Sequence, residues 1–325
     1  MMKERARVAC GFSLVASLAI IAGGCAGGGE GALSPVVESY VHKYGISVAK
    51  NEWESRGKDG KVITQRKDGV TVTRQYSAGE LSGETTYTLP YTPLIARTER
   101  YERGELIAEC DHYTNGGRKR ERCYLPNHTV AVTTWYENGT PCSRETFQGD
   151  LLVSGEYLSP TNVIEGRVEA KDGLRIVRSS QGELLSEDEI ANGQMVTRTT
   201  FLATGEPESI TPYFDGAIHG IRKSFLPGGV PKLFETYVLG SLHGYATSFL
   251  NGEKHAEIPY ENGYKHGLER IYGPGGSLVE EISWLRDRKH GADLFLLESE
   301  RKVDWYHQGQ LVSKAIFDRL NPQPS

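Results

Sequence analysis

Short runs in which apolar and polar residues alternate fill most of the chain after residue 48, as in residues 70–73 (Val-Thr-Val-Thr) and 129–134. Alternation with a period of two places successive side chains on opposite faces of a β-strand. The runs are separated by dipeptides that suit tight hairpin turns. These dipeptides include Asp59-Gly60, Asp68-Gly69, Asn115-Gly116 and Asn138-Gly139. The pattern therefore predicts an all-β chain of consecutive antiparallel hairpins.

A short helix is expected near the start of this region. Ser34 and Pro35 precede the segment 36–44, and Gly45 follows it. A serine cap, a proline in the first turn and a closing glycine are signals that begin and end helices. We therefore predict one or two helical turns over residues 36–44.

A longer repeat occupies residues 201–309. The motif Tyr-x-x-Gly-x-x-His-Gly occurs in four copies at spacings of 24, 23 and 24 residues, and the last copy has Trp284 for Tyr and Asp287 for Gly. Its glycine and histidine positions are Gly216, His219, Gly220, Gly240, His243, Gly244, Gly263, His266, Gly267, His290 and Gly291. Aromatic residues also recur every 11 or 12 residues between Phe201 and Tyr306. Each such interval is one strand plus one turn, so we expect stacked hairpins in which each aromatic covers the turn of its neighbour.

This motif resembles the MORN repeat, and more closely the bacterial MORN-variant repeats. The matching residues are Tyr237, Gly240, His243 and Gly244, and again Tyr260, Gly263, His266 and Gly267. The resemblance covers residues 201–309, about a third of the chain, and it implies an elongated antiparallel sheet. Upstream, Tyr113-Thr-Asn-Gly116 and Tyr136-Glu-Asn-Gly139 keep the 23-residue spacing without the His-Gly pair. A degenerate version of the same architecture is therefore expected there.

The first 24 residues have the pattern of a bacterial export signal. Three basic residues precede an apolar stretch over residues 8–22, which is short for a membrane span. The sequence Ala-Gly-Gly before Cys25 resembles a lipobox, with Ala22 in place of the usual Leu. The resemblance implies cleavage after residue 24 and lipidation of Cys25. The glycines of residues 25–34 then predict a flexible tether. Simple secretion and an uncleaved anchor are the alternatives.

Export determines how the remaining cysteines are interpreted, because Cys110, Cys123 and Cys142 would mature in an oxidising compartment. Cys110 and Cys123 lie symmetrically about Gly116-Gly117. A hairpin centred there would place the two thiols opposite each other. We therefore predict a disulfide between Cys110 and Cys123, and the alternative is three reduced, half-buried thiols.

Charge and motif content argue against several function classes. The formal net charge of -5 makes the chain a poor polyanion binder, so no nucleic-acid partner is expected. No phosphate-binding loop, dinucleotide fingerprint or nucleophile elbow is present. Carboxylate pairs such as Glu187-Asp188-Glu189 and Glu280-Glu281 are interpreted as solvated charges. We predict no catalytic residue, no cofactor and no small-molecule substrate.

The repeated histidines are the remaining candidates for a metal site. Neighbouring rungs of a stacked array lie about 10 Å apart, because each hairpin adds two strands. Two nitrogens on one metal ion must lie within about 4 Å of each other. We therefore predict no metal site, and expect each histidine to hydrogen-bond a turn and to pack on an aromatic ring.

Two further features have alternative interpretations. The basic cluster at residues 118–122 is either a contact for an anionic headgroup or nucleic acid, or a charged edge strand that resists aggregation. The column of Tyr and Phe residues is either a groove for protein or glycan contacts, or the core of the stack.

These observations divide the chain into a signal peptide (1–24), a lipidated tether (25–34), a divergent β-hairpin region (35–200), MORN-like repeats (201–312) and a C-terminal tail (313–325). The leading hypothesis is a non-enzymatic lipoprotein of the bacterial envelope, held in the outer rather than the inner membrane, whose sheet binds or scaffolds an envelope protein. The alternatives are an envelope enzyme or glycan-binding module with its site in residues 46–200, and a secreted effector. Bacterial relatives of the repeat are often labelled antitoxin components, but neutralising a cytoplasmic toxin is difficult to reconcile with export.

Overall fold

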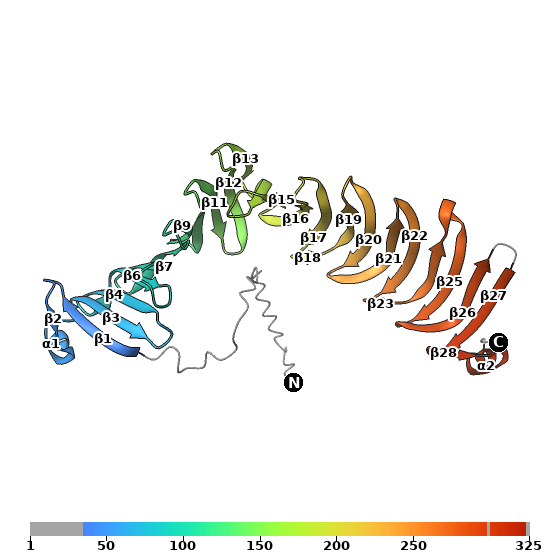
Figure 1. Cartoon of the computed structure of the whole chain (residues 1–325), viewed down its shortest axis with the longest axis horizontal. Helices are drawn as coiled ribbons and strands as arrows, with labels where there is room; N and C mark the ends of the chain where they lie inside the picture. The colour runs from blue at the N-terminus through green and yellow to red at the C-terminus, as the bar shows by residue number, and fades with distance from the viewer. Residues whose placement is uncertain (1–34, 298–299, 323–325) are drawn as a thin grey trace, which may run out of the picture.

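The computed structural model describes residues 35–297 and 300–322. These residues form an elongated arc of antiparallel strands with a short helix near each end (Figure 1). The predicted all-β architecture of stacked hairpins is confirmed. The signal segment, Cys25 and the tether lie outside the described residues.

The long strands follow one another across the sheet in chain order, each pairing antiparallel with the next long strand. The first arm and the centre contain β1 (Pro35–His42), β2 (Ser47–Val48), β3 (Gly60–Arg66), β4 (Thr71–Ser77), β5 (Glu80–Leu81), β6 (Gly83–Thr88), β7 (Ile95–Glu102), β8 (Glu105–His112), β9 (Arg118–Leu125), β10 (Thr129–Trp135), β11 (Pro141–Gln148), β12 (Leu151–Leu158), β13 (Ile164–Glu169), β14 (Asp172–Arg178), β15 (Leu184–Ala191) and β16 (Gln194–Phe201). The second arm contains β17 (Pro207–Phe214), β18 (Ala217–Ile218), β19 (Gly220–Leu226), β20 (Val230–Val238), β21 (Ser241–Leu250), β22 (Glu253–Glu261), β23 (Tyr264–Lys265), β24 (Gly267–Tyr272), β25 (Leu278–Leu285), β26 (Arg288–Leu297), β27 (Glu300–His307) and β28 (Gln310–Val312). Four two-residue strands, β2, β5, β18 and β23, pair only with the long strand that precedes them. A 3-10 turn, η2 (Pro274–Gly276), joins β24 to β25.

The two long edges of the sheet are built from different turns. On one edge both central turn residues have positive φ, as in Asn262 (52°) and Gly263 (86°), which is the requirement of a type I′ hairpin. Successive turns on this edge are joined by backbone hydrogen bonds: the N–H of Gly240 donates to Ile218 and that of Gly263 to Leu242, both at 2.8 Å. The other edge consists mostly of longer loops, such as the one that contains Gly139 (86°), although Asn251 (52°) and Gly252 (84°) form a two-residue turn there too. The first edge, called here the type I′ edge, is therefore a stacked column of turns.

The His-Gly pair of the motif forms a bulge after each type I′ turn. In one repeat β23 pairs with β22, the chain then bulges, and pairing resumes in β24. Gly267 at the bulge has a φ of 107°, and a Cβ on it would lie 3.3 Å from the ring of Pro259. Gly267 also lies directly opposite Trp284 on the next strand. The same pairing joins Gly220 to Tyr237, Gly244 to Tyr260 and Gly291 to Tyr306. Each aromatic therefore lies opposite its neighbour's bulge glycine, a correction to the expectation that it covers the turn.

A row of directly opposed residues crosses the middle of the strands, and we call it the central row. Its members are acidic, basic and small or apolar residues, and most are buried although the sheet is a single layer. In segments of continuous register the row contains Thr85, Glu99, Glu109, Arg122, Val132, Glu145, Gly155 and Val168; then Arg175, Asp188, Arg198 and Thr211; then Arg222, Glu235, Ala246 and Ile258; and finally Glu269, Ile282 and Asp293. Buried charges require partners, so this row forms ion pairs along the length of the sheet.

The helix predicted over residues 36–44 is a strand instead. The segment is rich in β-branched and aromatic residues, and as β1 it pairs along most of its length with β3. Pairing with a distant strand therefore outweighs the local helix signals. The N-terminal helix is α1 (Lys50–Ser55), whose Trp53 is 4% exposed and packs 5.9 Å from the ring of Tyr40.

The segment expected to be a tail also has structure. Helix α2 (Lys314–Leu320) begins at Ser313, whose hydroxyl accepts the N–H of Ile316 at 3.3 Å. Its Phe317 packs against Trp305 with ring centroids 5.0 Å apart. Both ends of the stack are therefore capped by short helices. Within the described residues, neither helix is long and apolar enough to cross a bilayer.

The sheet folds on itself at its centre, where the two arms of the arc meet (Figure 1). Strands β13 and β14 pair over two residue pairs only, and Gly173 there has a φ of 142°. Strand β14 consequently lies close to β12 as well as to β15. A core of Leu152, Tyr157, Val168, Ile176 and Ile190 fills this fold. A Cβ on Gly166 would lie 2.8 Å from Ile176, so the glycine allows the close approach.

Candidate functional site

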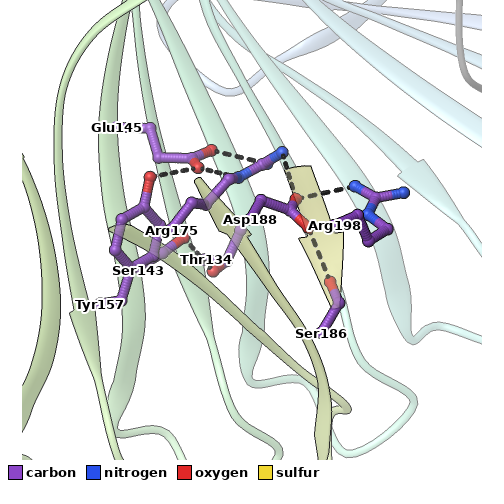
Figure 2. A network of polar contacts seen from close by, with 8 residues as sticks. All are labelled: Thr134, Ser143, Glu145, Tyr157, Arg175, Ser186, Asp188 and Arg198. Carbon is purple, nitrogen blue, oxygen red and sulfur yellow. Dashed lines mark hydrogen bonds and ion pairs between the residues drawn. The ribbon is translucent and has the colours of Figure 1, made fainter. Parts of the chain in front are cut away.

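A buried polar network spans the central fold (Figure 2). Asp188 of β15 has no solvent-exposed surface and receives two hydrogen bonds of 2.7 Å from the guanidinium of Arg198. Arg175 of β14 lies 3.9 Å from Asp188 and donates to Glu145 of β11 at 2.7 Å. Arg175 therefore bridges two carboxylates from strands far apart in the sheet and fastens the fold.

Hydroxyl groups complete the network. Tyr157 donates to Glu145 at 2.9 Å, and Ser186 donates to Asp188 at 3.1 Å. Burial, followed by the charge of Glu145, raises the pKa of Tyr157 far above its ordinary value. Burial opposes the charge of Arg175, but the neighbouring Glu145 outweighs it and raises the pKa of that guanidinium. The raised pKa values keep Tyr157 and Arg175 protonated, which suits a structural role better than proton transfer.

The network corrects the interpretation of the carboxylate pairs as solvated charges. Asp188 is fully buried and ion-paired. Glu281 is half-buried and accepts a hydrogen bond from Arg270 at 3.0 Å, and burial together with Asp293 raises the pKa of Glu280. The one available signal in the sequence is that these acids and their arginines recur at strand spacing.

A second ion-pair cluster lies in the first arm. Glu109 accepts hydrogen bonds from Arg122 at 2.7 Å and Tyr124 at 3.1 Å, and Arg97 also pairs with it. Burial alone would raise the pKa of Glu109, but these partners outweigh burial and lower it. In the first arm, as at the central fold, a carboxylate of the central row is therefore stabilised by arginine ion pairs and a tyrosine hydrogen bond.

The cysteines do not pair in the structure. Cys110, Cys123 and Cys142 are all free thiols. The loop is closed by a hydrogen bond from the N–H of Tyr113 to Gly117 and is therefore centred on Asn115 rather than on Gly116-Gly117. Cys110 consequently lies opposite Glu121, and Cys123 lies opposite Ala108. The two thiols are diagonal neighbours, a spacing of about 7–8 Å between Cα atoms that exceeds ordinary disulfide geometry. The predicted disulfide is therefore absent.

The histidines of the motif lie on the type I′ edge, between successive turns. The Nδ1 of His243 accepts the N–H of Asn262 in the next turn at 3.5 Å, and that of His290 accepts the N–H of Gln308 at 3.3 Å. The predicted hydrogen bond to a turn is thus confirmed for these two residues. His219 instead packs 5.7 Å from the ring of Phe214, and His266 lies 3.5 Å from the carboxylate of Glu261.

The motif aromatics are half-buried and serve the stack. Lys265 lies 4.5 Å from the ring of Trp284 and donates to Glu269 of the central row at 3.1 Å. Lys289 repeats this arrangement, lying 5.1 Å from the ring of Tyr306 and pairing with Asp293. A lysine stem therefore covers the rings of Trp284 and Tyr306, which favours the interpretation of the aromatic column as core.

A row of exposed apolar residues lies along the type I′ edge of the second arm. Phe214, Leu239 and Tyr264 are exposed by 63%, 60% and 53%, and Val238 and Leu285 are also exposed. Their turns are consecutive in the column of turns joined by backbone hydrogen bonds. We call these five residues the turn-edge stripe.

The basic cluster lies on β9, which pairs with β8 and β10, so the interpretation as an edge strand is wrong. Its Lys119 and Arg120 line a pocket of about 370 Å³ beside the central fold. The walls are completed by Trp135, Ser143 and Glu145 on one side and by Arg175, Arg178 and Ser180 on the other. The pocket is thus a concave site within residues 46–200, where the sequence offered no motif.

Comparison with known proteins assigns no family. No model of a known protein family and no curated protein matches the sequence. A TcdB2-TccC3-Cdc42 crystal structure aligns with 75% of this chain and 19% of that chain, at 11% identity and a TM-score of 0.20. A porin-like protein from Bacteroides uniformis ATCC 8492 aligns over 82% and 92%, at 9% identity and a TM-score of 0.16. This chain spans about a fifth of the first of these chains. Both TM-scores are too low to indicate a function.

Proposed function

We propose that this chain is a non-enzymatic lipoprotein of the bacterial envelope that holds a protein partner along the turn-edge stripe. The observation that carries the proposal is the regular exposure of large apolar side chains at successive type I′ turns of the second arm. Hydrophobic residues scattered singly are normal on a surface, but a row at repeat spacing is typical of a binding site.

The arrangement favours an extended protein segment as the occupant. Adjacent hairpins in a stacked sheet are about 10 Å apart, so the stripe presents apolar contacts at regular intervals over several turns. Fully burying each such side chain contributes about 1.5–3 kcal/mol. The underlying turns are fixed by the column of backbone hydrogen bonds, so the backbone of the stripe loses little conformational entropy when a partner binds.

The central row supports a scaffold over an enzyme. Its carboxylates are committed to arginines, lysines and tyrosines, as at Glu145, Asp188 and Asp293. A general acid or base needs a pKa near the working pH and access to a substrate. These buried pairs instead make a single-layer sheet self-supporting, which leaves both of its faces available.

The stripe is tested by comparing two triple variants of the full chain purified from its native membranes. One carries Phe214→Ser, Leu239→Ser and Tyr264→Ser. The matched control carries Leu94→Ser, Leu125→Ser and Val163→Ser, which are exposed by 45%, 47% and 59% but lie outside the stripe. We expect one protein to co-purify with the wild type and the control, and to be lost from the stripe variant. Equal recovery with both variants would refute the proposal.

The anchor is tested separately by intact-mass measurement of the wild type and a Cys25→Ala variant. Lipidation predicts a diacylglycerol-sized addition on Cys25 and a mature chain that begins there. The variant should remain unprocessed. A mature wild-type chain without lipid would contradict the anchor while leaving the stripe untouched.

A further inference from the structure

The pocket beside the central fold has an excess of positive charge in a chain whose net charge is -5. Four basic residues line it, Lys119, Arg120, Arg175 and Arg178, against one carboxylate, Glu145. Arg178 is paired with Glu165 at 2.7 Å, and Arg175 is paired with Glu145. Two of the four positive charges in the pocket are therefore paired with carboxylates.

Lys119 and Arg120 are the uncompensated side. Among the described residues neither is within ion-pair distance of a carboxylate, although both line the pocket. Desolvation and the neighbouring Arg122 lower the pKa of Arg120, and the more distant charges of Asp111, Glu145 and Glu109 oppose that shift. The side chain is solvent-exposed, so its guanidinium is open to an incoming anion. The ammonium of Lys119 lies 5.7 Å from the centroid of the Tyr113 ring.

The remaining walls supply a flat apolar surface and hydroxyl groups. Trp135 lines the pocket, with the guanidinium of Arg118 5.7 Å from its ring. Thr134 and Ser143 share a hydrogen bond of 2.7 Å, so one of their two hydroxyl protons can be donated to a ligand. A volume of about 370 Å³ accommodates a small molecule rather than a polymer.

We propose that this pocket binds an acidic sugar, with its carboxylate or phosphate on Lys119 and Arg120 and its ring against Trp135. Guanidinium groups bind both anions through paired hydrogen bonds. An indole face is a suitable surface for a ring with polar edges. The pocket is formed by the first arm and the central fold, so the site is independent of the turn-edge stripe.

The test is isothermal titration of the full chain in detergent with four probes: glucuronate, glucose 1-phosphate, glucose and inorganic phosphate. The first two should bind, and the tighter of them identifies the anion. Glucose should not bind, and added salt should weaken both acidic sugars. Inorganic phosphate should bind at least about tenfold more weakly than glucose 1-phosphate, because it has no ring to place on the indole. Equal affinity for inorganic phosphate would overturn the role of Trp135.

The variant Lys119→Gln with Arg120→Gln should weaken binding of the acidic sugars by at least about tenfold. The control Lys61→Gln with Lys232→Gln makes the same change in net charge at exposed positions outside the pocket and should bind as the wild type does. Lys119→Gln alone serves if the double variant is unstable in thermal unfolding. The proposal would be overturned if neither glucuronate nor glucose 1-phosphate binds, or if the test and control variants lose affinity for them equally.

Discussion

Replacing the bulge glycine Gly267 should destabilise the protein far more than the same change at the turn glycine Gly263, four positions earlier. Gly263 has a φ of 86° and a Cβ there would meet nothing within 4 Å. Gly267 has a φ of 107°, outside the left-handed region that Asn and Asp tolerate, and its Cβ would press on Pro259 at 3.3 Å. Asparagine separates the two cases better than alanine, because it accepts the turn conformation but not the bulge.

The chain already shows that the turn position accepts another residue. In the fourth repeat Asp287 takes the place of the turn glycine with a φ of 63°, and its carboxylate accepts the N–H of Lys265 at 2.7 Å. We therefore expect Gly263→Asn to change the free energy of unfolding by less than about 1 kcal/mol. Gly267→Asn should cost about 2–3 kcal/mol, from backbone strain and the contact with Pro259.

The assay is urea unfolding followed by tryptophan fluorescence. Trp284 lies directly opposite Gly267, so the local environment contributes to the signal. A difference of about 1.4 kcal/mol is a tenfold change in the unfolding equilibrium, which the method resolves. Equal costs at the two positions, or a neutral Gly267→Asn, would refute the division of the motif glycines into turn and bulge positions.

Three further predictions concern the buried groups. Asp188→Asn should lower the free energy of unfolding by about 1–3 kcal/mol in urea unfolding, because it removes the charge that pairs with the half-buried Arg198. Cys110 should react with iodoacetamide at pH 8 about a hundredfold more slowly than an unperturbed thiol, since burial raises its pKa to about 11; rapid labelling followed by peptide mass analysis would contradict this. Burial would raise the pKa of Glu109 and of Glu257, but their hydrogen-bonding and charged partners lower it. Both carboxylates therefore stabilise the folded state at pH values above the ordinary pKa of 4.5, and this stabilisation is lost as the pH falls through their lower folded-state pKa. The urea midpoint should accordingly fall between pH 5 and pH 3 more steeply than in a Glu257→Gln variant.

Local chemistry made the hairpins predictable from the sequence. Turn residues act within a few positions of themselves, so Asn262-Gly263 indicates its turn without knowledge of the rest of the chain. The regular repeat spacing then predicts that the hairpins stack in chain order, because the aromatic residue of each hairpin needs a neighbouring hairpin to cover it. The helix predicted at residues 36–44 was wrong for the complementary reason: β1 is fixed by pairing with β3, whose residues lie 18 to 31 positions further along the chain.

The central fold and its pocket depend on contacts that no local pattern displays. The hydrogen bond from Arg175 to Glu145 joins residues 30 positions apart, across a kink at Gly173. In the sequence Asp188 has the same appearance as a solvated charge, and its burial follows only from the row that the register creates. The missing disulfide has a similar origin, since a loop centred on Asn115 places Cys110 opposite Glu121 rather than opposite Cys123.

Photo-crosslinking in native membranes tests the central claim most directly. A photoreactive phenylalanine analogue would be placed singly at Leu239 and at Tyr264 in the stripe, and at the exposed control position Leu125. The account predicts that both stripe positions form an adduct with the same protein and that Leu125 forms none. Adducts of equal yield from all three positions, or none from either stripe position, would contradict a partner held along the turn-edge stripe.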